Sequence, residues 1–210
     1  MRSCLLILVT LAVCGCGVPK PTPSTPDIDP QFPVGPFSLT ERSGKTITDA
    51  DLRGKVWIAS FVFTRCTGPC PAVTSTMTRL QSELSDELKA GKVKLVTFTV
   101  DPARDDMSSL REYANLRGAD ANNWLFLTGD EGTVHKLLAS QFKQGVERHT
   151  GADVQPGDEF EHSTRLLVID TENVIRGIYP GLRDEKQHNP DATFTADLER
   201  LKARVRGLLK

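Results

Sequence analysis

An unbroken apolar segment, residues 55–63, constrains the fold more than any other feature of the chain. It does not alternate between apolar and polar side chains, so it predicts a strand that is covered on both faces. A helix is predicted directly after it, at 71–89, because apolar residues recur there at intervals of three and four: Val73, Met77, Leu80, Leu84 and Leu88. A buried strand followed at once by an amphipathic helix is typical of a layered α/β sheet.

The rest of the chain continues this alternation of strands and helices. A hairpin is expected at 37–40 and 46–48, strands at 94–100 and 124–127, helices at 107–116 (capped by Asp106) and 131–140, a second hairpin at 165–170 and 174–179, and a closing helix at 191–209. Alternation alone also fits a flavodoxin-like sheet. The hairpin before the last helix favours a thioredoxin-like three-layer fold with a mixed central sheet and an N-terminal hairpin.

Residues 1–16 have the pattern of a targeting segment and are left out of the fold. Arg2 supplies a positive start, and the apolar run at 5–13 is too short to span a bilayer comfortably. The end of the run resembles a bacterial lipoprotein signal, in which small residues precede a cysteine that is acylated. We therefore expect a lipid anchor.

Two cysteines compete for this role. Cys16 follows Gly15, the small residue that such a site prefers, whereas Cys14 follows a bulkier valine. Cys16 is the favoured anchor, and an ordinary cleaved secretory signal is the alternative. Each of these alternatives predicts an extracytoplasmic domain with thiols exposed to oxidation, and acylation would tether it to a bacterial membrane, on its periplasmic face.

Proline recurs through residues 17–32, which favours extended polyproline II structure and excludes a helix. This segment is interpreted as a linker between the anchor and one domain at 33–210. The formal net charge is −1, and no long run of basic residues occurs, so nothing indicates nucleic-acid binding.

The chemistry of the chain is concentrated in a pair of cysteines. Cys66 and Cys70 lie between the predicted strand and helix, and Pro71 suits the first turn of that helix. Cys70 is thereby placed near the helix N-terminus, where N–H groups and the helix dipole stabilise a thiolate. A structural disulfide is the alternative, although a domain of this size has a core and does not need one.

Four stretches resemble the SCO/SenC family. The first, Phe-Val-Phe-Thr-Arg-Cys-Thr-Gly-Pro-Cys-Pro at 61–71, is similar to the family's strand followed by Thr-x-Cys-x-x-x-Cys-Pro. The others are 54–57, 99–105 with 110–113, and a late His-Ser at 162–163, so that the likeness runs from about 36 to 179. Members of this family have a thioredoxin-like fold and bind copper with two cysteines and a histidine.

The resemblance implies a metal site made of Cys66, Cys70 and His162 and a role in assembling the binuclear copper site of cytochrome c oxidase. Thiolates are soft ligands that suit Cu(I), and an imidazole suits Cu(II). The copper-receiving subunit of an oxidase is then the expected partner. One departure is the neutral and stiff segment 67–69 between the cysteines, where the family usually has an acidic or polar group.

Two functions use the same cysteines. The first is a metallochaperone that binds copper and delivers it; the second is an extracytoplasmic thiol–disulfide oxidoreductase, with Cys66 and Cys70 as its catalytic redox pair. His162 separates them, because dithiol exchange does not need an imidazole. A redox sensor is a third interpretation, and no output domain supports it.

Several other polar residues have open roles. Asp101 and Asp105 either tune the metal site or dock a partner, or Asp101 makes a turn and Asp105 caps the next helix. Arg65 either lowers the pKa of Cys66 or is a solvated charge. The remaining histidines are expected to be solvated: His135, His149 and His188. The polar stretch 147–161 is expected to be a mobile loop that carries His162.

Overall fold

The structure is a computed structural model that describes residues 28–210. The predicted signal segment, the anchor candidates Cys14 and Cys16 and most of the proline-rich linker lie outside the described residues. Phe32 begins the first strand, and Asp29 pairs with Arg176 at 2.5 Å. Between residues 28 and 210, no helix is both long and apolar enough to cross a membrane.

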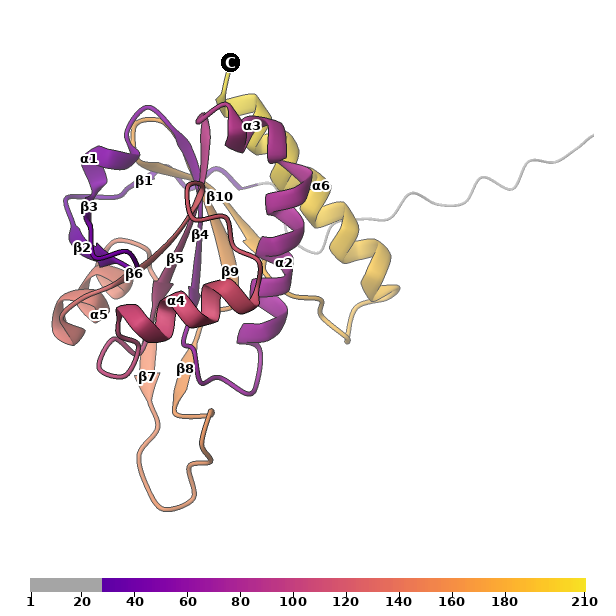
Figure 1. Ribbon diagram of the computed structural model, residues 1–210. Helices are drawn as coiled ribbons and strands as arrows, with labels where there is room; N and C mark the ends of the chain where they lie inside the picture. Colours follow the sequence, from indigo (N-terminus) through magenta and orange to yellow (C-terminus); the bar gives the residue numbers. More distant parts are fainter. Residues whose placement is uncertain (1–27) are drawn as a thin grey trace, which may run out of the picture.

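A mixed sheet forms the centre of the described part (Figure 1). Its three central parallel strands are flanked on both sides by antiparallel ones. Across the sheet, the eight strands are β1 (Phe32–Pro33), β10 (Val174–Pro180), β9 (Arg165–Ile169), β4 (Val56–Val62), β5 (Val93–Thr99), β6 (Trp124–Thr128), β2 (Ser38–Glu41) and β3 (Thr46–Thr48). The N-terminal hairpin of β2 and β3 attaches to β6 and so forms one edge.

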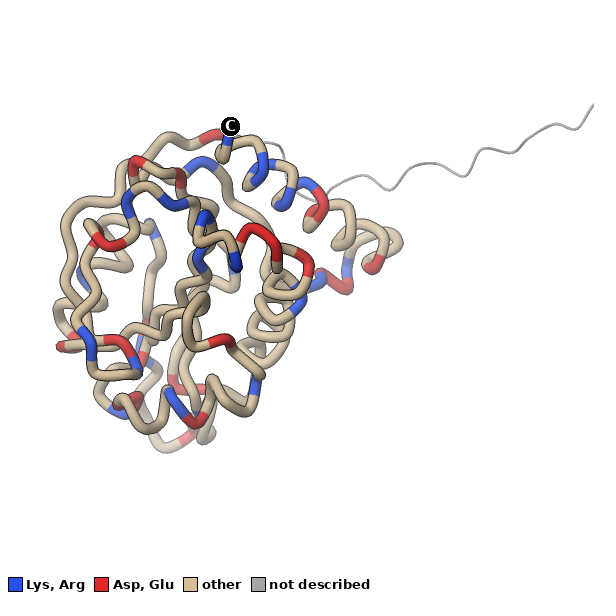
Figure 2. Tube along the Cα trace, turned by 45° about the horizontal axis from the view of Figure 1, so that its top comes forward, with Lys and Arg blue, Asp and Glu red and all other residues tan. Residues whose placement is uncertain are grey.

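Helices cover both faces of the sheet, as the three-layer prediction requires. On one face lie four helices: α2 (Cys70–Glu83), α3 (Ser85–Lys89), α4 (Met107–Leu116) and α6 (Pro190–Leu208). Helix α5 (Glu131–Ser140) lies on the other face, where aromatic side chains form the core. The short α1 (Asp49–Leu52) follows β3. Helix α6 is paired with α2 through Lys202 and Glu83 and with α3 through Arg206 and Glu87, each ion pair at 2.7 Å. Figure 2 shows both signs of charge along the helix that ends at the C-terminus.

Four aromatic rings pack on the α5 side of the sheet. Phe142, just after α5, contacts Trp57, Phe61 and Phe98 with ring centroids 6.1, 5.6 and 5.0 Å apart. On the opposite face, α2 packs on β4 and α4 packs on β6, and the Thr74 and Tyr113 hydroxyls join the two helices by a hydrogen bond of 2.7 Å. All residues of β4 are buried, which confirms the strand covered on both faces.

The single helix predicted at 71–89 is wrong in one respect. Residue Leu84, with φ −111° and ψ 23°, leaves the helical region and separates α2 from α3. Its side chain is nevertheless fully buried, as are those of Val73, Met77 and Leu80, so the apolar stripe is continuous across the break. The periodicity therefore identified the buried face correctly but not the change in backbone direction.

The stretch predicted as a mobile loop at 147–161 is structured at both ends. Strands β7 (Val146–Arg148) and β8 (Phe160–His162) pair antiparallel as a separate two-stranded ribbon. In its register Val146 lies opposite His162 and Arg148 opposite Phe160. His162 is thus the last residue of a paired strand. The sequence did not indicate this strand, because polar strands with few apolar residues give no clear sequence signal.

Candidate metal centre

The cysteine loop begins where β4 ends and closes at the first turn of α2. Cys70 is the first residue of α2, one position earlier than predicted, with Pro71 next in the helix. Its side chain is fully buried, whereas Cys66 is partly exposed. Both thiols are free in the structure. The loop therefore presents one accessible sulfur and one sulfur held at a helix N-terminus, where the dipole favours negative charge.

The two thiols influence each other's ionisation. A hydrogen bond from the Cys70 side chain, helped by backbone N–H groups, lowers the pKa of Cys66 to about 6. The same bond and burial raise the pKa of Cys70. Cys66 is therefore a thiolate near neutral pH, and Cys70 is the protonated donor that stabilises it. A thiolate is the form that binds metals and attacks disulfides.

His162 completes the group of soft and borderline donors. Its Nε2 lies 3.5 Å from the Cys70 Sγ, and its Nδ1 donates to the Ser163 carbonyl at 3.0 Å. A carbonyl only accepts, so this bond fixes the proton on Nδ1 and leaves the Nε2 lone pair facing the sulfur. Burial lowers the pKa of His162, which keeps the imidazole neutral. A neutral imidazole with a fixed tautomer is ready to bind a metal.

The structure thus brings the three predicted ligands close to one another: the Cys70 thiol is hydrogen bonded to Cys66, and its Sγ lies 3.5 Å from the His162 Nε2. From residue 28 onwards, no three His, Cys, Asp or Glu side chains already form a metal-binding cluster. Cys66 and His162 are both partly exposed, whereas Cys70 is fully buried.

Asp105 anchors the cysteine loop and does not cap α4. Its buried carboxylate accepts hydrogen bonds from the Thr64 N–H at 3.1 Å, from the Thr64 hydroxyl at 2.6 Å and from the Thr99 hydroxyl. Burial raises the pKa of Asp105, and the bonds from the threonines oppose this shift. The cap is Asp106, whose side chain accepts from the Ser109 N–H at 2.8 Å, as predicted. Asp105 therefore fixes the backbone two residues before Cys66.

Asp101 makes the expected turn, since its carbonyl accepts from the N–H groups of Arg104 and Asp105. It also has a second role that sequence reasoning missed. Its fully buried carboxylate pairs with the Arg104 guanidinium. Parallel pairing of β4 with β5, up to Val62 opposite Thr99, places this turn at the same sheet edge as the cysteine loop.

Gly157 holds the tip of the β7–β8 connection against the cysteine loop. Its carbonyl accepts from the Thr67 N–H at 3.2 Å. A Cβ at this position would lie 2.6 Å from the Thr67 side chain and 2.8 Å from the Arg65 carbonyl, and its φ is +94°. Only glycine suits this approach and this backbone region. The sequence marked Gly157 as a loop residue but gave no sign of its contact.

The remaining candidates do not join the centre. Arg65 is exposed, and the lowered pKa of Cys66 is explained by hydrogen bonds, which favours the solvated interpretation. His188 is exposed as expected. The prediction for His135 is wrong: it is half-buried, and its Nε2 bonds to the Val100 carbonyl at 2.7 Å. His149 lies 3.7 Å from the exposed Glu161.

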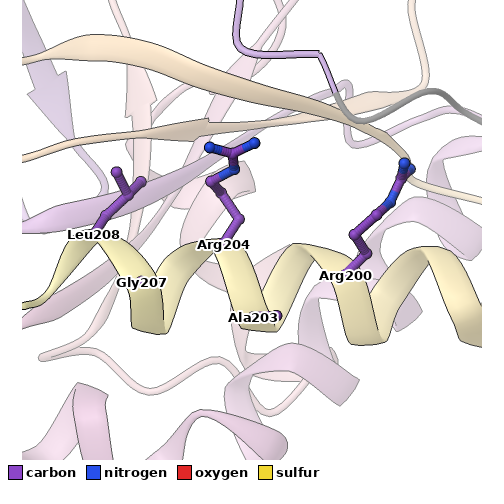
Figure 3. A pocket seen from close by; sticks show the side chains of 5 residues that line it. All are labelled: Arg200, Ala203, Arg204, Gly207 and Leu208. Atoms are coloured by element: carbon purple, nitrogen blue, oxygen red, sulfur yellow. The ribbon is translucent and has the colours of Figure 1, made fainter.

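A hollow on α6, shown in Figure 3, lies on a different element from the three ligands. The side chains of Arg200 and Arg204 rise from the same side of the helix there. Arg200 pairs with Asp197 at 3.1 Å and Arg204 with Asp29 at 3.7 Å. Because carboxylates already balance both guanidinium groups, this hollow is not assigned a ligand.

Comparisons of sequence place these features in context. A family model described as SCO1/SenC matches residues 26–196. The SCO1 protein homolog of Bacillus subtilis (strain 168) is 33% identical over 179 residues, which are 84% of this chain and 86% of that protein. The mitochondrial protein SCO2 of Saccharomyces cerevisiae is 33% identical over 141 residues, 66% of this chain but only 44% of the relative.

Solved structures agree with the sequence comparisons. A SCO1/SenC family lipoprotein from Bacillus anthracis str. Ames matches with a TM-score of 0.72 and 27% identity, covering 87% of this chain and 98% of that chain. BsSco, a member of the Sco family of cytochrome c oxidase assembly proteins in which a disulfide switch was identified, gives 0.70 and 25% identity, covering 87% and 96%. Yeast Sco1 with copper bound gives 0.60 and 25%, covering 83% and 90%. These likenesses confirm the predicted thioredoxin-like fold.

Proposed function

The chain belongs to the SCO1/SenC family, and we propose that it is a metallochaperone that binds copper and delivers it to the binuclear copper site of a respiratory cytochrome c oxidase. The observation that carries the proposal is the Nε2 lone pair of His162, which faces the Cys70 sulfur at 3.5 Å, beside the Cys66 thiolate. Copper is the metal bound to yeast Sco1, and BsSco is an oxidase assembly protein.

In this proposal the three side chains have different tasks. Cys66, as a thiolate, captures the metal first because it is the exposed sulfur with the lowered pKa. Cys70 then loses its proton and becomes the second sulfur ligand. His162 supplies a nitrogen through Nε2, which suits Cu(II) as well as Cu(I). Copper is cargo in this scheme, so the site must also release it.

An extracytoplasmic thiol–disulfide oxidoreductase is the second candidate, and the lowered pKa of Cys66 favours it. The Cys66 thiolate would attack a partner disulfide, and Cys70 would then resolve the mixed disulfide. The partner disulfide gains two electrons and becomes two thiols, while the cysteines of this chain become a disulfide. The disulfide switch identified in BsSco is consistent with such chemistry in a relative.

Copper transfer separates the two functions. The full chain, loaded with copper, is mixed with the metal-free, reduced copper-receiving subunit of the oxidase, and formation of the binuclear site is followed by its optical absorption. We expect the loaded chain to fill the site faster than an equal concentration of free copper. The contrary result has two parts. The loaded chain fills the site of the reduced subunit no faster than free copper does, and the copper-free reduced chain allows free copper to fill the site of an oxidised subunit. The oxidoreductase would then replace the metallochaperone as the function.

We also propose that residues 1–16 are a lipoprotein-type signal, 17–32 a linker and 33–210 the thioredoxin-like domain. The similar Bacillus anthracis protein is a lipoprotein, which supports an extracytoplasmic, lipid-anchored location. The mature chain is expected to begin at an acylated Cys16, because Gly15 precedes it. Mass spectrometry of the N-terminal peptide tests this, and an unmodified start beyond residue 16 would indicate a plain secretory signal.

A further inference from the structure

A buried carboxylate lies between two arginines near the candidate metal centre. Asp101, just after β5, is fully buried, and one of its oxygens pairs with Arg104. Its other oxygen, Oδ1, lies 3.8 Å from a guanidinium nitrogen of Arg148 and has no hydrogen-bond partner among residues 28–210. A buried carboxylate is costly unless positive charge compensates it, so Asp101 holds both guanidinium groups in place.

Both arginines connect to the ribbon that carries His162. Arg104 extends from the β5–α4 turn to Glu159, the residue before β8, with an Nη1–Oε1 distance of 2.6 Å. Arg148 belongs to β7 and also pairs with Glu131 at the start of α5. The ribbon is therefore tied at two points to the main fold, and Asp101 is common to both.

Phe160 lies between the two arginines and the part of β8 that carries His162. The guanidinium carbons of Arg148 and Arg104 lie 4.9 and 6.0 Å from the centroid of the Phe160 ring. Phe160 and His162 are two positions apart in β8, so they share one face of the ribbon. Both rings contact Phe63 edge-on, with centroids 5.4 and 5.9 Å away. Phe63 directly follows β4 and begins the cysteine loop.

We propose that Asp101 is a positioning residue for His162, acting through Arg104, Arg148 and Phe160. Its carboxylate fixes the two guanidinium groups that cover Phe160, and this sets the distance between the Nε2 of His162 and the cysteine sulfurs. The inference rests on the proposed function, since it concerns the same metal site. Without the carboxylate, Arg104 keeps only Glu159 and Arg148 keeps only Glu131, so the two guanidinium groups lose their shared partner and β8 shifts.

The test compares Asp101→Asn with Asp106→Asn in the full chain. Asparagine keeps the size of Asp101 and removes its charge, and Asp106 caps α4 next to the same turn without touching the ribbon. We expect Asp101→Asn to weaken Cu(II) binding roughly 10- to 100-fold, the range for residues that orient a metal ligand. Its Cu(II) electron paramagnetic resonance spectrum should lose the nitrogen hyperfine pattern of the imidazole. Cu(I) binding should stay within about threefold of the control.

The Cu(I) and Cu(II) affinities of Asp101→Asn decide the inference. An Asp101→Asn chain with wild-type Cu(II) affinity and nitrogen hyperfine pattern overturns it, and so does an equal loss of Cu(I) and Cu(II), which indicates general damage to the fold. If Asp101→Asn does not fold, Arg148→Gln tests the same link, because Arg148 is 46% exposed, and it must then produce the selective loss of Cu(II). A wild-type chain that binds no copper overturns the proposed function itself, and this inference falls with it.

Discussion

A full chain in which both Cys66 and Cys70 are replaced by serine is expected to lose copper affinity by at least about 10,000-fold. Removing a residue that merely orients a ligand costs about 10- to 100-fold, and removing a ligand itself should cost at least about the upper value, so the loss of two ligands should cost at least about 10,000-fold. Serine hydroxyls are hard, protonated donors that do not replace soft thiolates for Cu(I). Elemental analysis and competition with a chelator of known affinity measure the change.

The three N-terminal cysteines are unchanged in this variant, so an unprocessed chain keeps any copper that they bind. Circular dichroism must show that the variant is folded, since Cys70 is fully buried against the core. One tightly bound copper per chain in the variant would contradict the assignment of Cys66 and Cys70. The copper would then have to be traced to Cys4, Cys14 and Cys16.

Replacement of His162 by alanine is expected to affect the two oxidation states of copper differently. Two thiolates satisfy Cu(I), so its binding should be largely retained, whereas Cu(II) should bind at least about 100-fold more weakly without the imidazole. Disulfide exchange by Cys66 and Cys70 should change little, because thiolate pKa and access control it. Burial and the Ser163 carbonyl, rather than a charge on the imidazole, determine the state of His162.

His188→Ala is the matched control, since His188 is an exposed histidine on another part of the surface. Affinities for both ions and the rate of exchange with a model disulfide should be measured on both variants. If His162→Ala keeps the Cu(II) affinity of the control and still supports oxidase assembly, the three-ligand site is wrong. The thiol–disulfide oxidoreductase would then be the better account of the cysteine pair.

Periodicity predicted the long elements of the fold well. The helices at 107–116 and 131–140 have the predicted bounds, because strong apolar stripes and the N-caps Asp106 and Asp130 define them. The break at Leu84 was not predictable from the stripe, since the buried face is continuous through it. Helix α1 was also missed, although Thr48 and Asp51 form a capping box at its start.

The candidate site was also predictable from the sequence only in part. The sequence predicted Cys66, Cys70 and His162 as ligands through a motif and a family resemblance, and the fold brings these side chains close to one another. The supporting residues depend on pairings that are distant in sequence. Asp105 reaches Thr64 across 41 positions and Arg104 reaches Glu159 across 55, so single-sequence patterns carried no sign of them. The prediction for His135 failed because its partner, the carbonyl of Val100, follows β5 and lies 35 positions earlier in the sequence.

The central claim is that Cys66, Cys70 and His162 bind copper together. X-ray absorption at the copper edge of the loaded full chain tests it most directly, because scattering distinguishes sulfur from nitrogen neighbours. With Cu(II), we expect two sulfur ligands and one imidazole nitrogen in wild type, two sulfurs without that imidazole in His162→Ala, and no sulfur in the Cys66→Ser, Cys70→Ser variant. A wild-type spectrum with only oxygen and nitrogen neighbours, or one unchanged in all three chains, would contradict it.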